Sequence, residues 1–96
     1  MKTETIIVTR HSALVDLLIE RGVINGDEKV ISHATSEDIT GKNVIGVLPL
    51  RLASMAKTVT EVPLNLTADD RGKELPIERL REIADDPVTY TVGVVN

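Results

Sequence analysis

Short runs of β-branched apolar residues alternate with helical patterns along almost the whole chain, and this alternation limits the fold more than any other feature. Five runs have the length and composition of strands: residues 5–8, 29–33, 43–48, 58–64 and 88–95. Three segments between them show the spacing of an apolar helix face: residues 12–21, 49–56 and 76–84. The alternation predicts one α/β domain over residues 1–96, with a Rossmann-like, mostly parallel sheet of about five strands covered by three helices.

Glycine and proline residues mark several of the expected boundaries. Gly22 suits the end of the first helix, because glycine readily adopts the left-handed conformation found there. Pro49 and Pro76 suit helix starts, where the missing N–H would have no partner in any case. Pro63 indicates an edge strand or the end of a strand. The polar composition of residues 34–42 predicts a connection without regular structure.

The end of the first predicted strand carries the most informative group of side chains. Ligands of parallel α/β sheets bind outside the carboxyl ends of the strands. The next helix begins there and offers unpaired N–H groups to an anion. Arg10 supplies a planar fork of donors, and His11 can transfer protons near neutral pH. We therefore predict a phosphodiester site with Arg10 and His11 as catalytic residues and Thr9 and Ser12 as substrate-binding residues, with an ordinary loop and a helix-capping His11 as the alternative.

Two other predicted strand ends carry polar or cationic side chains. His33 follows the second strand, where a packed or exposed histidine with no role is favoured over a second imidazole in the cleft. Without a suitably spaced carboxylate, the two histidines do not indicate a metal site. Leu48 and Pro49 form a strand-to-helix junction whose backbone amides can line a ligand, and Arg51 can reach a phosphate. An ordinary helix start with an exposed arginine explains the same three residues.

The longest irregular stretch, residues 65–75, contains two cations around a glycine. Gly72 permits a positive φ or the close approach of a ligand. Arg71 and Lys73 suit a polyanion, and long loops of this kind often close over ligands. A surface turn with ordinary charges, paired in part with Asp70, is the alternative.

Charge and aromatic content restrict the kinds of ligand. The net charge of −4 argues against long nucleic acid, because such binding needs clustered cations. Tyr90 is the only Phe, Trp or Tyr residue, whereas platforms for single-stranded RNA or DNA need several rings. Arg79 and Arg81 lie on the third predicted helix and are expected to be solvated. An anionic ligand must therefore meet a local group of cations.

Other function classes lack their signatures. There is no cysteine, no apolar run long enough for a membrane span and no signal-peptide pattern, so we expect a cytoplasmic protein that does not contact the membrane. Motifs of dinucleotide binding, nucleoside triphosphate hydrolysis, zinc proteolysis and serine hydrolysis are absent. We expect neither a metal nor a cofactor.

Three segments resemble the small CRISPR-associated family called Csx-sixteen. They are VTRHSALVDLLIERG, GKNVIGVLPLRLA and LTADDRGKEL, and they occur in the family's order. The resemblance covers most of the chain and implies a CARF-like version of the predicted fold. It also implies association with type III CRISPR systems, whose cyclic oligoadenylate messengers switch on defence effectors.

The family is similar to ring nucleases, which linearise cyclic tetra-adenylate and end the response. The resemblance therefore implies a protein that opens this ring, and we expect it to do so without metal, by attack of a ribose 2′-OH on the adjacent phosphate. Because the ring has rotational symmetry and a C2 dimer presents one patch twice, we also expect a homodimer. Two other functions stay open: a dimer that binds cyclic oligoadenylate without cutting it, and an interaction subunit with no nucleotide site.

Overall fold

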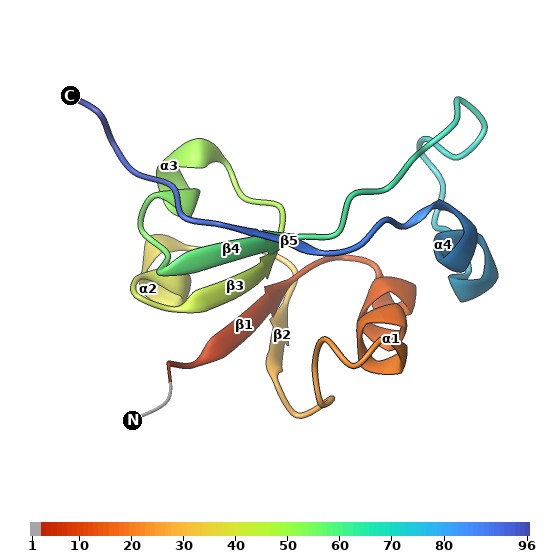
Figure 1. Ribbon diagram of the computed structural model, residues 1–96, viewed down its shortest axis with the longest axis horizontal. Coiled ribbons are helices and arrows are strands. Elements are labelled where there is room, and N and C mark those ends of the chain that lie inside the picture. The colour runs from red at the N-terminus through yellow and green to blue at the C-terminus, as the bar shows by residue number, and fades with distance from the viewer. Residues whose placement is uncertain (1–2) are drawn as a thin grey trace.

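The computed structural model, which describes residues 3–96, confirms the α/β expectation (Figure 1). The strands are β1 (Thr5–Val8), β2 (Lys29–Ile31), β3 (Asn43–Gly46), β4 (Thr58–Glu61) and β5 (Val88–Tyr90). The helices are α1 (Ser12–Glu20), α2 (Ser36–Ile39), α3 (Leu50–Ala53) and α4 (Ile77–Ile83). The strands form one sheet in the order β2-β1-β3-β4-β5, parallel except for the antiparallel pair of β4 and β5.

Apolar side chains of the central strands pack on both faces of the sheet. Ile7 of β1 and Ile45 of β3 are register partners and contact Leu18 of α1 on one face. Val44 of β3 belongs to a second buried cluster, with Ala53 of α3, on the other face. Figure 1 shows α2 and α3 on the side of the sheet opposite α1, and α4 beside α1. The Val- and Ile-rich strands are those of a sheet covered on both faces.

Helix α1 follows the predicted pattern closely. Leu17 and Leu18 are buried, and Leu14 is half-buried on the same side of the helix. The helix ends before Gly22, which has a φ of +73°, as expected. The N–H of Val23 donates to the carbonyl of Leu18 at 2.9 Å and closes the last turn.

The prediction of an irregular connection over residues 34–42 is wrong, because α2 lies within it. The hydroxyl and the backbone N–H of Thr35 both donate to the Asp38 carboxylate, each at 2.9 Å. This carboxylate satisfies a donor at the start of the helix and complements its dipole. The side chain of Ile39 is completely buried and holds the short helix against the sheet.

Four strands end earlier than predicted. They are β2, β3, β4 and β5, which stop at Ile31, Gly46, Glu61 and Tyr90. Gly46 has a φ of +145°, and a Cβ atom there would lie 2.2 Å from the carbonyl oxygen of Val8. Pro63 follows the end of β4, as expected of a residue without a backbone donor. After β2, β3 and β4 the chain thus leaves the sheet at its carboxyl edge earlier than predicted, and the antiparallel β5 ends early at the opposite edge.

The arginines of α4 correct the expectation that they are only solvated. Arg79 binds the largely buried Asp70 through two hydrogen bonds of 2.7 and 2.9 Å. The backbone N–H and hydroxyl of Thr67 also donate to Asp70, each at 2.9 Å. Arg81 is exposed but pairs with Glu20 of α1 at 2.6 Å. These contacts fix the base of the 65–75 loop to α4 and join α4 to α1.

Within residues 3–96, none of the helices combines the length and the apolar character needed to cross a membrane.

Candidate functional site

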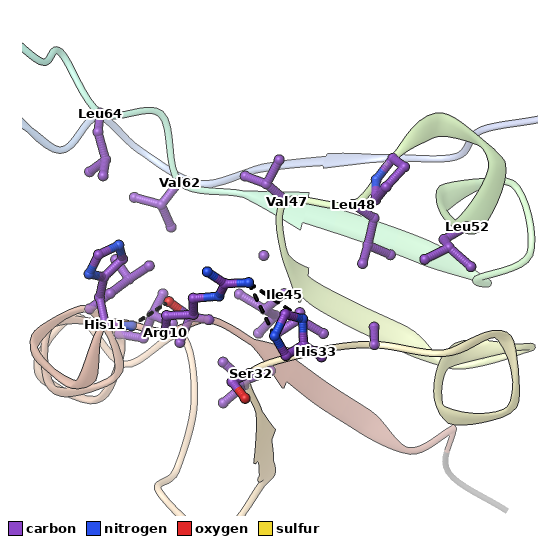
Figure 2. Close-up of a pocket in the computed structure, with 18 residues that line it drawn as sticks. Arg10, His11, Ser32, His33, Ile45, Val47, Leu48, Leu52, Val62 and Leu64 are labelled. Carbon is purple, nitrogen blue, oxygen red and sulfur yellow. Dashed lines mark hydrogen bonds between the residues drawn. The ribbon is translucent and has the colours of Figure 1, made fainter. Parts of the chain in front are cut away.

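A cavity of about 550 Å³ lies at the carboxyl ends of the parallel strands (Figure 2). Its polar side chains come from the turns after β1 and β2, and its apolar side chains come from the strands themselves, from α1 and from the segments after β3 and β4. Parallel α/β sheets bind ligands at this edge. The position of the cavity therefore agrees with the position predicted for the site. It is lined in part by Thr9, Arg10, His11, His33, Leu48 and Pro49.

Thr9 holds the turn that presents the next two side chains. Its backbone N–H donates to the carbonyl of Ile31 at 3.0 Å, one residue beyond the end of β1. Its hydroxyl accepts a hydrogen bond from the backbone N–H of His11 at 3.1 Å. Thr9 thus shapes the turn that directs Arg10 into the cavity.

Arg10 lies beside His33 in the cavity, whereas the sequence favours a His33 that has no role in the cleft. A terminal guanidinium nitrogen of Arg10 lies 3.1 Å from Nε2 and 3.5 Å from Nδ1 of His33. Both side chains are exposed, and Figure 2 shows their contact. No carboxylate among the described residues forms an ion pair with Arg10. Its charge therefore remains available to an anionic ligand.

His11 occupies the position before the first turn of α1, but its side chain makes no capping hydrogen bond. This finding contradicts the alternative in which the imidazole caps the helix. Figure 2 shows His11 on one side of Arg10 and His33 on the other. The cavity therefore presents a guanidinium between two exposed imidazoles.

A second cavity of about 390 Å³ adjoins the first, and His11, Leu14 and Leu64 line both. Its other walls come from α4 and from the 65–75 loop. The loop residues predicted to bind substrate all line it, namely Arg71, Gly72 and Lys73. The structure thus brings the loop cations next to the strand-end site.

The loop cations do not pair with Asp70, contrary to the alternative drawn from the sequence. Asp70 instead binds Arg79, and this guanidinium, together with Thr67, holds the pKa of the Asp70 carboxyl well below its usual range. Arg71 and Lys73 are exposed at the rim of the second cavity. The Asp70 carboxylate is thus committed to the loop's own structure.

Two predicted binding residues lie elsewhere. Ser12 begins α1, Arg51 lies on α3, and neither lines either cavity. The sequence analysis missed Gly46, which lines the first cavity and lets β3 approach β1 closely. An isolated glycine within an apolar strand pattern is the signal that could have identified it.

Metal-ligating side chains do not gather among residues 3–96. No group of three or more histidine, cysteine, aspartate or glutamate side chains has an arrangement that could hold a metal ion there.

Comparison with known proteins places the chain in a sequence family. The family model described as "Putative CRISPR-associated protein (Cas_VVA1548)" matches residues 6–93. This range includes every side chain that lines the two cavities. Neither the curated proteins nor the solved structures give a match.

Proposed function

The chain belongs to this CRISPR-associated family, and on that premise we propose that it is a ring nuclease acting on cyclic tetra-adenylate. The observation that carries the proposal is the guanidinium of Arg10, which forms no ion pair within residues 3–96 and shares a cavity at the carboxyl edge of the sheet with His11. A phosphodiester uses both groups, one for its charge and one for proton transfer. The resemblance to Csx-sixteen supplies the cyclic substrate.

The proposed reaction is a transesterification that needs no water. A ribose 2′-oxygen attacks the adjacent phosphorus, and the bond from phosphorus to the 5′-oxygen breaks. One new end carries a 2′,3′-cyclic phosphate and the other a 5′-hydroxyl, so the atoms of the ring are all retained. Arg10 stabilises the charge that grows on the non-bridging oxygens, and His11 assists proton transfer. Holding the ring so that attack is in line supplies much of the rate.

The second cavity suits the neighbouring nucleotide. It adjoins the first at His11, and its leucine side chains can contact an adenine where a stacking ring is absent. Arg71 and Lys73 would bind the next phosphates along the ring. A C2 dimer would present these cations twice around a ligand that itself has rotational symmetry. In such a dimer Arg51 could also reach the ring.

The first prediction concerns Arg10. Arg10→Ala should lower the rate of ring opening by about 10²-fold or more, because the charge developing on the phosphate loses its principal donor. Chromatography of cyclic tetra-adenylate incubated with the pure protein in EDTA measures this rate. Lys29→Ala, which removes a cation outside both cavities, is the matched control and should cut normally. An Arg10→Ala protein that binds and cuts like the wild type would refute the site.

A second candidate function is capture of the ring without cleavage. One observation favours it: no hydrogen bond to a carboxylate orients either imidazole among residues 3–96. Catalytic histidines are commonly held by such a partner. Intact cyclic tetra-adenylate that co-elutes with the protein, after incubation at equal concentrations, would favour capture over cleavage.

A further inference from the structure

We propose that His33 is the base that takes the proton from the attacking 2′-hydroxyl, and that His11 gives a proton to the departing 5′-oxygen. This assignment rests on the proposed ring-opening reaction and deepens it. It rests on the placement of the two imidazoles around Arg10, and on the contact that only one of them makes with the guanidinium.

The two imidazoles come from different parts of the chain to one cavity. His33 follows β2, and His11 precedes α1. Figure 2 shows Arg10 between them. In an in-line displacement the attacking and departing oxygens lie on opposite sides of phosphorus. A phosphate bound by Arg10 would therefore have an imidazole available on each side, as separate base and acid catalysis requires.

The contact with Arg10 distinguishes the two imidazoles. The guanidinium nitrogen lies 3.1 and 3.5 Å from the two ring nitrogens of His33, whose hydrogen-bonding directions diverge in the plane of the ring. One nitrogen that is near both must face the ring instead of lying along either direction. The guanidinium therefore holds the imidazole in the cavity and leaves its in-plane nitrogen atoms open. An in-plane nitrogen is the atom that accepts a proton from the 2′-hydroxyl.

His11 makes no corresponding contact with a cation. Its backbone N–H bonds to Thr9, and no side-chain hydrogen bond of His11 is formed among the described residues. The His11 imidazole is therefore free to contact the departing oxygen. The protons balance: one passes from the 2′-hydroxyl to His33, one passes from His11 to the 5′-oxygen, and solvent restores both imidazoles.

The test replaces the departing oxygen of one linkage with sulfur. A cyclic tetra-adenylate with one 5′-phosphorothiolate linkage opens there by breaking the bond from phosphorus to sulfur, and the 5′-thiolate formed at the new end departs without being protonated. His11→Gln should slow opening of the all-oxygen ring by about 10²-fold. The same variant should open the sulfur linkage at close to the wild-type rate, because the thiolate needs no proton. His33→Gln should slow opening at both linkages by about 10²-fold, because the attacking hydroxyl still needs its base.

Controls separate this inference from the proposed function. Lys29→Ala should open both rings at the wild-type rate. Thermal melting and binding of the all-oxygen ring check that each variant is folded and still binds. Wild-type rates for His33→Gln, or rescue of His33→Gln by sulfur, would overturn the assignment while leaving the ring nuclease intact. A wild-type protein that opens neither ring would overturn the proposed function itself.

Discussion

At the scale of the residue, the site depends on a cation, Arg10, that has no carboxylate partner in the described part of the chain. The chain has 15 acidic and 11 basic residues, so the carboxylates outnumber the cations that could pair with them. Lys42, Arg79 and Arg81 form ion pairs, whereas among residues 3–96 the Arg10 guanidinium forms none and hydrogen-bonds an imidazole. A guanidinium without a carboxylate partner at the sheet edge can bind a small anion, whereas the acidic net charge disfavours a long one.

Gly46 carries the second prediction. Gly46→Ala should lower the free energy of unfolding by about 3 kcal/mol, since the new Cβ would meet the Val8 carbonyl and the φ of +145° suits only glycine. Urea denaturation measures the change. Gly93→Ala is the control, because a Cβ at Gly93 meets nothing, and it should stay within about 0.5 kcal/mol of the wild type. Equal stability of the two variants would contradict the close approach of β3 to β1.

At the scale of the element, the 65–75 loop is held at its base and exposed at its tip. The bonds from Thr67 and Arg79 to Asp70 close the base, while Gly72 at the tip has a φ of +75°. The fixed base keeps Arg71 and Lys73 at the second cavity although neither lies in a helix or strand. The ion pair of Asp70 and Arg79 therefore positions the loop cations.

The third prediction is the acid response of this ion pair. Arg79, and then Thr67, lower the pKa of Asp70 in the folded protein, so the stabilisation is complete above the ordinary carboxyl pKa of about 4. It is lost as the pH falls from that value through the folded pKa. Asp70→Asn should lower the melting temperature at neutral pH and flatten the loss of stability in acid.

Calorimetry from pH 7 downward measures both effects. Asp69→Asn changes an exposed neighbour in the same loop and should keep the wild-type profile. An acid limb that is identical in Asp70→Asn and the wild type would show that Asp70 does not carry this linkage.

The elements also show what the sequence can predict. Residues 5–8 and the helix beginning at Ser12 were predicted closely, because a β-branched run and a leucine stripe are local signals. The ends of β2 and β3 were placed too late, because the residues that follow their last ladder pair line the cavity instead of extending the strand, and after β3 these residues are apolar. The nearness of His33 to Arg10 depends on the pairing of β1 with β2, which the local sequence does not predict.

At the scale of the whole molecule, apolar residues at the cavity rim remain exposed. Val47 and Leu50 expose 74% and 78% of their surface, on either side of Leu48 and Pro49, which line the cavity. A second copy bound about a two-fold axis at this rim would cover them and bring two cavities together. The rotational symmetry of the proposed ligand favours a second copy of the chain over a different protein as the molecule that covers this rim.

The fourth prediction is that this rim joins two copies. Leu50→Lys should convert a dimer into a monomer, because an isologous interface would bring two new charges together. Sedimentation equilibrium measures the mass in solution. Val95→Lys, at a fully exposed valine that does not line the cavity, is the control and should leave the dimer intact. A monomeric wild type, or a Leu50→Lys protein that remains dimeric, would contradict the interface.

The most direct test of the central claim is the mass of the first product made in EDTA. Attack by the 2′-hydroxyl rearranges bonds within the ring, so the linear product should have the same mass as cyclic tetra-adenylate while eluting separately from it. Liquid chromatography with mass spectrometry distinguishes the two species. A first product heavier by one water, or a ring that stays intact at equal concentrations of protein and ligand, would contradict the proposed reaction.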